Sequence, residues 1–336
     1  MNFSRFTGQL LAGAVSAALL AGCNGGSQFA PPTGSAASAP ATLGEAGAKH
    51  AGVSPGWVMY TGCALHNGQL QWYWINPRNY VWYWLKTSHI TKGDSTLGGS
   101  ATQATALAVA TTDDTVVIYS GKKPVTTLTG LNGAASGVGM DSRGDTFAAV
   151  NVGSEATIDE FAQGATTPTA TYADPNLTSV ASLGIDRMNR VYVEGQSQTG
   201  TIEVDEMAGS GSFEPLAQAG ALGATAGGLA VQSSGKTTYL YVNDLGNASE
   251  PANIARYEFT GKSLIKQGSF EYSGTNGAIA ADPSGKDTKH VYAINNVPAG
   301  SQYSVSGIEY AFPSGQIVVQ SSAYAASEES HGIWVK

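Results

Sequence analysis

Short apolar segments, each followed by a polar turn, recur along most of the chain. Four of them open with a glycine, at Gly137, Gly184, Gly228 and Gly277, and the intervals between these glycines are 47, 44 and 49 residues. Each unit continues with further short segments of the kind that form β-strands. A four-stranded unit with a period in the forties is typical of a propeller blade. Residues 104–336 are therefore predicted to form an all-β β-propeller.

The two ends of this region complete each other. Residues 104–130 contain apolar runs at 106–109, 115–119 and 124–128, which fit the second, third and fourth strands of a unit but leave the first strand missing. The C-terminal residues 331–336 begin with the Gly-apolar pattern of a first strand. We predict that the two segments pair in one blade, because a ring closed by a strand from each end leaves no exposed sheet edge. This count gives five four-stranded blades, or six if the aromatic segment upstream forms its own.

The aromatic segment lies within 53–103. Two apolar runs, 69–75 and 80–85, flank the turn-like sequence Asn-Pro-Arg-Asn at 76–79, so a β-hairpin is predicted. Its strands carry four tryptophans: Trp72, Trp74, Trp82 and Trp84. Two-residue periodicity allows all four to share one face. Such a face is either an exposed platform for a sugar, a lipid surface or a partner protein, or the side that packs on the domain.

The N-terminus has the pattern of a signal peptide, residues 1–22. One cation precedes an apolar run over 10–20 that is too short to span a bilayer as a helix. The run ends in Leu-Ala-Gly-Cys23, which resembles the lipobox of bacterial lipoproteins. That resemblance implies that Cys23 becomes the first mature residue and carries the acyl chains. The alternative is an ordinary secretory signal cleaved near Ala21.

A tether is predicted after the cysteine. Residues 23–52 are small, polar and proline-containing, a composition that cannot bury enough apolar surface to fold, and a flexible coil of this length spans about 30 Å on average. Asn24, rather than an aspartate, follows the cysteine, which resembles lipoproteins that are sent on to the outer membrane. We expect a lipid-anchored protein of the outer membrane, facing the periplasm or the cell surface.

The repeats resemble NHL-type repeats, a family of short propeller blades. The likeness rests on a Gly-apolar-x-x-Asp turn, as in GVGMD from Gly137, followed by an apolar-Tyr-Val strand, as in VYV at 191–193, and it covers roughly 104–336. The family includes scaffolds, ligand binders and a few enzymes. The resemblance therefore implies the fold much more than a function.

The charge balance narrows the choice of partners. The chain carries 17 Lys and Arg against 25 Asp and Glu, a formal net charge of −8, and only 12% of its residues are charged. Nucleic acids and anionic lipid headgroups are poor partners for such a surface. The expected partners are the membrane, through the anchor, and an unidentified protein or glycan.

Three aspartates recur at one place in the repeats, at Asp141, Asp186 and Asp282. The residues three positions later are Gly144, Asn189 and Gly285. This is the pattern of a tight turn in which Asp caps the backbone and the last position has a positive φ, a region that Asn tolerates better than most residues. We therefore interpret the aspartates as turn residues rather than as metal ligands.

The sharpest enzymatic hypothesis comes from gluconolactonase-type propellers, which look similar and hold one calcium ion at the mouth of the channel. Among the nine residues at corresponding positions here, five are the candidates for the channel mouth: Asn151, Glu194, Asn243, Asn276 and His331. Calcium takes six to eight oxygen ligands with several carboxylates, whereas this set offers one, Glu194. The resemblance therefore leaves a calcium-dependent lactonase-like hydrolase as an alternative only.

No other catalytic pattern stands out. The five histidines have no metal-ligand spacing, and the sequence contains no nucleophile elbow and no phosphate-binding loop. We expect a binding or scaffold protein without catalytic residues or a cofactor. A carbohydrate-binding surface protein is a further alternative.

Overall fold

The computed structural model describes strands within 58–85 and most of the chain from 106 to 335. The segments between 58 and 335 that it leaves undescribed are 67–68, 76–81, 86–105, 112–113, 121–122, 134, 219–221, 248, 273–274, 283–284, 301, 321–323 and 327–331. The predicted signal peptide, Cys23 and the tether lie outside the described residues. Strands, turns and loops make up the described part, without an α-helix, so the all-β prediction is confirmed. Within these residues there is no helix with the length and apolarity needed to cross a membrane.

The described strands form six sheets. The sheet ordered β25-β1-β2-β3 comprises β1 (Val58–His66), β2 (Gln69–Ile75), β3 (Trp82–Leu85) and β25 (Gly332–Val335). The sheet ordered β4-β5-β6 comprises β4 (Ala106–Thr111), β5 (Thr115–Ser120) and β6 (Lys123–Leu128). The sheet ordered β10-β9-β8-β7 comprises β7 (Ala135–Met140), β8 (Thr146–Val152), β9 (Glu155–Phe161) and β10 (Ala170–Asp174).

The other three sheets continue the same meander. The sheet ordered β11-β12-β13-β14 comprises β11 (Leu177–Ile185), β12 (Val191–Ser197), β13 (Ile202–Met207) and β14 (Phe213–Pro215). The next comprises β16 (Ala226–Ser234), β17 (Thr237–Asp244), β18 (Asn253–Phe259) and β19 (Ser263–Glu271), with the parallel strand β15 (Ala217–Gln218) added at its edge. The last comprises β20 (Thr275–Ala280), β21 (His290–Ala299), β22 (Gln302–Ala311) and β23 (Gln316–Gln320), and β24 (Tyr324–Ala326) also pairs with β22.

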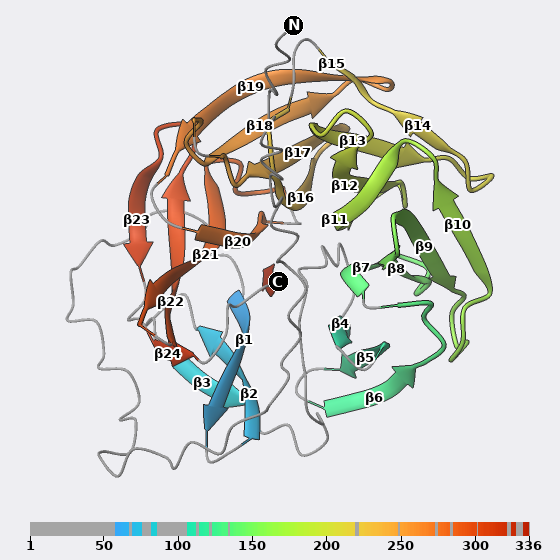
Figure 1. Cartoon of the computed structure of the whole chain (residues 1–336), viewed down its shortest axis with the longest axis horizontal. Helices are drawn as coiled ribbons and strands as arrows, with labels where there is room; N and C mark the ends of the chain where they lie inside the picture. Colours follow the sequence, from blue (N-terminus) through green and yellow to red (C-terminus); the bar gives the residue numbers. More distant parts are fainter. Residues whose placement is uncertain are drawn as a thin grey trace, which may run out of the picture.

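The sheets follow one another around a common centre (Figure 1). Antiparallel meanders set radially in this way are the architecture of a β-propeller. Each of the four predicted repeat openings lies on the first strand of a sheet, namely β7, β11, β16 or β20. The period of the sequence is therefore the period of the sheets.

The opening glycines lie where neighbouring first strands approach each other. A Cβ atom on Gly137 would lie 2.8 Å from the backbone nitrogen of Leu183, on the next sheet. A Cβ atom on Gly184 would overlap Cγ2 of Val231, one sheet further on. Since real Cβ contacts are longer than this, glycine is required by the close packing of the inner strands.

The core lies between neighbouring sheets. One cluster joins Phe147 and Ile158 to Leu183 and Ile185 of the following sheet, all at most 3% exposed. At two further junctions an arginine lies over an aromatic ring of the next sheet, with Arg190 Cζ 4.5 Å from the ring centroid of Phe259. Apolar burial supplies most of the stabilisation between sheets, and these cation–π contacts add to it.

The recurring aspartates are turn residues, as predicted. Asp141 Oδ1 accepts hydrogen bonds from the N–H groups of Arg143 and Asp145, at 2.8 and 3.0 Å. Asp186 Oδ1 makes the same two contacts with Met188 and Arg190. The positions that end the three turns all have positive φ: Gly144 at 93°, Asn189 at 62° and Gly285 at 66°.

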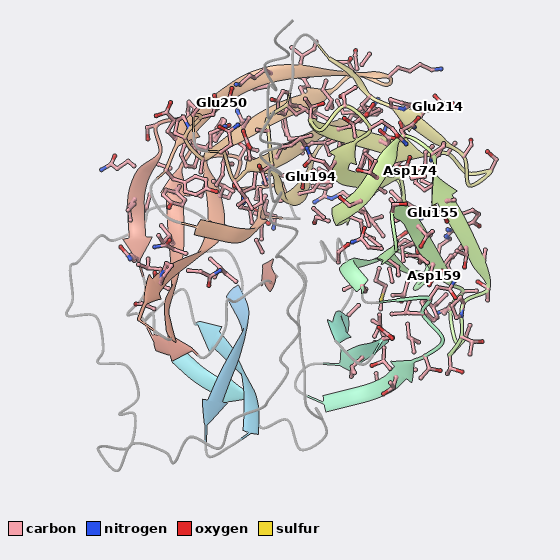
Figure 2. The ribbon with its side chains drawn as sticks, in the orientation of Figure 1. Glu155, Asp159, Asp174, Glu194, Glu214 and Glu250 are labelled. Atoms are coloured by element: carbon pink, nitrogen blue, oxygen red, sulfur yellow. The ribbon has the colours of Figure 1, made fainter. Side chains whose placement is uncertain are left out.

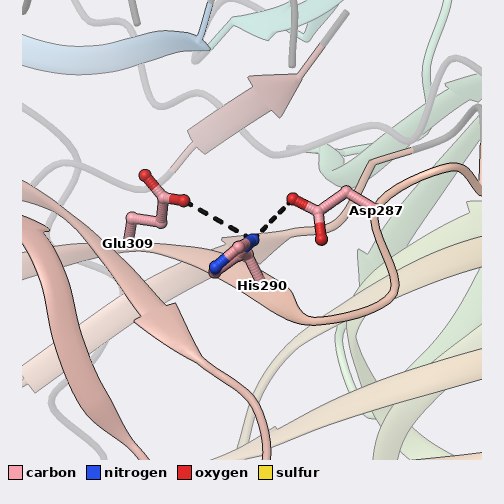
Figure 3. Close-up of side chains that lie close together, drawn as sticks. All are labelled: Asp287, His290 and Glu309. Carbon is pink, nitrogen blue, oxygen red and sulfur yellow. Dashed lines mark hydrogen bonds and ion pairs between the residues drawn. The ribbon is translucent and has the colours of Figure 1, made fainter. Parts of the chain in front are cut away.

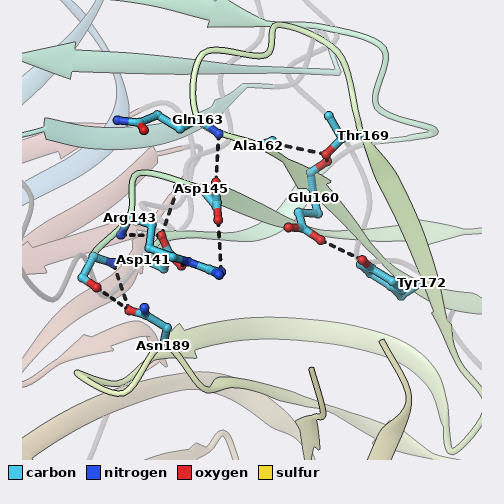
Figure 4. A network of polar contacts seen from close by, with 10 residues as sticks. Asp141, Arg143, Asp145, Glu160, Ala162, Gln163, Thr169, Tyr172 and Asn189 are labelled. Atoms are coloured by element: carbon cyan, nitrogen blue, oxygen red, sulfur yellow. Dashed lines mark hydrogen bonds and ion pairs between the residues drawn. The ribbon is translucent and has the colours of Figure 1, made fainter. Parts of the chain in front are cut away.

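Asn189 also joins two turns of neighbouring sheets. Its Oδ1 accepts hydrogen bonds from the backbone N–H and the hydroxyl of Ser142, at 3.0 and 2.8 Å. Figure 4 shows this contact beside the ion pairs of Arg143 with Asp141 and Asp145. An asparagine in place of glycine therefore provides both the positive φ and a contact between sheets.

The predicted partner of the C-terminal strand is wrong. β25 pairs antiparallel with β1, with Ile333 opposite Tyr60 and Val335 opposite Val58, and not with the strands of 106–128. In the described residues, β4, β5 and β6 form a three-stranded sheet of their own. The Gly-apolar pattern identified a first strand correctly, but a sequence motif shared by every unit cannot specify which sheet receives it.

The predicted hairpin is present, but its register differs from the expectation. β2 and β3 are antiparallel, with Trp72 opposite Leu85 and Trp74 opposite Tyr83. Ile75 pairs with Trp82, so every even-numbered position of β2 faces an odd-numbered position of β3. Residues directly opposite each other lie on one face of a sheet, and successive residues alternate between faces. Trp72 and Trp74 therefore lie on one face of the sheet, and Trp82 and Trp84 lie on the other.

Candidate functional site

The residues that end the second strand of each sheet were the main candidates for a site at the channel mouth. Asn151, on β8, reaches the first strand of the next sheet. Its Nδ2 donates to the carbonyl oxygen of Val180 at 2.9 Å, and its Oδ1 accepts from the N–H of Val180 at 2.8 Å. Both polar atoms of this side chain are thus used to join two sheets.

Glu194 holds the same position on β12 and lies toward the inner side of the ring (Figure 2). It is fully buried, and neither carboxyl oxygen has a hydrogen-bond partner. Burial raises the pKa of Glu194 to about 8, and the charge of Asp244 acts in the same direction. The N–H groups of Gly227 and Gly228 lower this pKa, but neither reaches hydrogen-bonding geometry, so burial dominates.

Asn243, on β17, is also held by a hydrogen bond, but its partner is a side chain rather than the backbone. Its Oδ1 accepts a hydrogen bond of 2.7 Å from the hydroxyl of Tyr272, which lies just before the first strand of the next sheet. The side chains of Asn276 and His331 lie outside the described residues. Of the three described candidates, Asn151 joins adjacent sheets, Asn243 bonds to the segment between β19 and β20, and Glu194 has no hydrogen-bond partner.

The four tryptophans of the predicted platform lie on β2 and β3, whose backbone is described and whose side chains are not. The platform thus stays a prediction.

A pair of buried carboxyls was not found from the sequence. Asn176 donates to both, through its backbone N–H to Asp174 Oδ1 at 2.9 Å and through Nδ2 to Asp205 Oδ2 at 2.6 Å. The other oxygen of each carboxyl is buried without a hydrogen-bond partner. Burial raises the pKa of both Asp174 and Asp205, and the charge of Asp174 raises that of Asp205 further. This arrangement favours retention of a proton. Only the fold brings these two aspartates together, so their separation along the sequence did not indicate that they would form a pair.

A pocket of about 610 Å³ opens beside β18 and β19. Glu250, Glu271 and Lys266 contribute charged groups to its wall, and Phe270 contributes an apolar surface. Asp244 also lines it, but its carboxylate already accepts hydrogen bonds from the N–H groups of residues 224, 225 and 246. The pocket therefore combines charged groups of both signs with one aromatic side chain.

No family model matches this sequence, and no curated protein sequence matches it. Solved structures that match include hydrazine synthase of Kuenenia stuttgartiensis, at a TM-score of 0.49 and 13% identity, covering 70% of each chain. The WD40 β-propeller domain of Doa1 matches with a TM-score of 0.44 and 16% identity over 69% of this chain and 70% of that one. U3-55K matches with a TM-score of 0.48 and 11% identity over 74% and 75%. Similarity at this level carries no information on activity or ligand, and the NHL-type and lipoprotein resemblances stay predictions.

Proposed function

We propose that this chain is a lipid-anchored extracytoplasmic β-propeller that acts by binding a partner rather than by catalysis. The observation that supports this role is the use of the recurrent polar residues to hold the ring together. Asn151 joins two sheets, and Asp141 and Asp186 cap turns. Residues that stabilise a scaffold in this way leave its surfaces and loops to provide specificity.

In this proposal each sheet is one blade. The ring then has six blades, and the pairing of β25 with β1 closes it. Closure by strands from the two ends of the chain would fix the propeller beside the end of the tether. The partner, a protein or a glycan, would then be bound within about a tether length, roughly 30 Å, of the membrane.

Anchoring is tested with Cys23→Ser. The natural protein is expected in the membrane fraction and to take up labelled palmitate, whereas the variant is expected in the soluble extracytoplasmic fraction. A natural protein that is soluble and begins near residue 22 without a lipid would instead support an ordinary secretory signal.

Partner binding through the aromatic hairpin is tested with two matched double variants. Trp72 and Trp74 are replaced by alanine in one, and Trp82 and Trp84 in the other, because the register places the pairs on opposite faces. A platform on one face predicts that only one double variant loses binding to a glycan panel or a purified partner while its melting temperature is retained. Equal binding by both variants and the natural protein would exclude the platform.

A calcium-dependent hydrolase is the second candidate, and Glu194 is the observation that favours it. A buried carboxyl with two unpartnered oxygens is a group that a cation could bind. A calcium titration that raises the melting temperature of the natural protein, and not that of Glu194→Gln, would support this candidate. No change in melting temperature would count against it.

A further inference from the structure

Three side chains with metal-binding groups meet at one side of the last sheet, which contains β20 to β24. His290 is the first residue of β21, Asp287 lies three residues before it, and Glu309 is on β22. Tyr292 pairs with Glu309, so His290, two residues before Tyr292, lies on the same face of the sheet as Glu309. Strand pairing, rather than spacing along the sequence, brings this set together.

The three groups converge on one nitrogen atom. His290 Nδ1 lies 2.6 Å from Asp287 Oδ2 and 3.7 Å from Glu309 Oε1 (Figure 3). The three ligand atoms all lie within 4.8 Å of one another, and no other group of three or more His, Cys, Asp or Glu residues does so in the part of the chain that the structure describes. Two ligand atoms bound about 2.1 Å from one ion are roughly 3–3.4 Å apart, so shifts of less than about 1 Å would complete the site.

The loop that carries Asp287 is fixed by the preceding sheet. Gln232 is fully buried, and its Nε2 donates to the carbonyl oxygens of Asp282 and Asp287, at 3.0 and 2.7 Å. Arg256 Nη1 donates to the carbonyl oxygen of Thr288 at 2.7 Å. A metal site requires ligands that are held in place by their surroundings, and these bonds provide that support.

The orientation of the Asp287 carboxylate is fixed as well. The N–H of Lys289 donates to Asp287 Oδ1 at 2.9 Å, which directs Oδ2 toward the imidazole. The side chains of His290, Asp287 and Glu309 are 23%, 12% and 12% exposed, so the site is partly shielded but open to ions from solution.

We propose that Asp287, His290 and Glu309 bind a divalent transition-metal ion of the zinc class. An imidazole nitrogen with two carboxylates suits such ions, whereas calcium and magnesium prefer oxygen ligands alone and soft ions prefer sulfur. Three protein ligands leave a coordination position for water or for an external ligand. The site lies at the start of β21 and is distinct from Glu194.

The test uses untagged protein, because a polyhistidine tag would itself bind metal. The protein is stripped with EDTA, dialysed and titrated with Zn²⁺ by calorimetry, and separately with Co²⁺ while visible absorption is recorded. One ion per chain is expected, together with Co²⁺ absorption bands typical of nitrogen and oxygen ligands and an increase of the melting temperature with Zn²⁺.

Two variants remove ligands while keeping the size of the side chains, Glu309→Gln and His290→Gln. Each is expected to weaken Zn²⁺ binding at least about tenfold, which is about 1.4 kcal/mol. The matched control is Glu258→Gln on β18 of the neighbouring sheet, a carboxylate that accepts a 2.9 Å hydrogen bond from Gln267 and is expected to leave Zn²⁺ affinity unchanged. Melting temperatures without metal establish that the variants are folded, and if His290→Gln is not, Glu309→Gln alone carries the test. Absence of stoichiometric binding, or binding that Glu309→Gln leaves intact, would overturn the proposal.

Discussion

Replacement of Glu194 by glutamine is expected to change how the stability of the protein depends on pH. The carboxyl is fully buried, neither oxygen has a hydrogen-bond partner, and its pKa is raised from 4.5 to about 8. The folded protein therefore binds a proton at this residue over a pH range in which the unfolded chain does not. Glutamine has nearly the same shape and no charge, so it keeps the packing and removes this titration.

The sign and the size follow from proton linkage. Below about pH 4.5 Glu194 is protonated in both states and the linkage has no effect on stability. Between about pH 4.5 and pH 8 only the folded state holds the proton, so stability falls as the pH rises, by about 1.4 kcal/mol per pH unit. From pH 5 to pH 8 the free energy of unfolding of Glu194→Gln should rise relative to that of the natural protein by about 4 kcal/mol.

The assay is urea unfolding of both proteins at pH 5, 6, 7 and 8. The difference between the two free energies matters rather than either value alone, because other buried carboxyls, Asp174 and Asp205 among them, contribute the same slope to both proteins. Glu214→Gln, a change at an exposed carboxylate with 57% of its side chain accessible, serves as the control for a substitution outside the core. A constant difference for Glu194→Gln as well would refute the reasoning.

Two further predictions concern the junctions between sheets. Gly137→Ala should lower the free energy of unfolding by about 1–3 kcal/mol, since its Cβ would lie 2.8 Å from a backbone nitrogen, whereas Gly209→Ala, with no atom within 4 Å, should stay within about 0.5 kcal/mol in the same urea assay. Arg190→Met should cost about 3 kcal/mol because it leaves the buried Asp186 without its cation. Arg143→Met removes an ion pair of the same 2.7 Å Nε–Oδ2 length to Asp141, which is just as buried, but the arginine side chain is 63% exposed rather than 25%, so this change should cost less than Arg190→Met. Equal losses for the two arginine variants would contradict the role assigned to burial.

Local chemistry made the strands and turns predictable. The turn that begins at Asp186 needs only a carboxylate that accepts two backbone N–H groups and a residue that tolerates a positive φ, and Asn189 supplies the second. These requirements act over four or five neighbouring residues, so the sequence shows them directly. The opening glycines were also visible, although the reason for them, the approach of the next first strand to Gly137, appears only in the fold.

Pairings between distant segments were not predictable in the same way. Every sheet needs a first strand, and the sequence of β25 suits that place equally well beside β1, where it lies, and beside the strands of 106–128. The faces of the hairpin depend on one register, the pairing of Ile75 with Trp82, and a change of one residue would reverse them. Glu309 lies on a different strand from His290, so only the pairing of β21 with β22 brings the two together.

Glu194 stands at a position where other repeats hold asparagine. Corresponding positions in the other units hold asparagine, and Asn151 shows what the position requires, one donor and one acceptor facing the backbone of the next first strand. An ionised carboxylate offers acceptors only, whereas a protonated carboxyl offers both a donor and an acceptor, as an amide does. Glu194 makes neither of these contacts, because both of its oxygens are buried without a hydrogen-bond partner, and burial is what raises its pKa. Loss of the proton would place an unpaired charge in the junction between β12 and β16, which should weaken that junction.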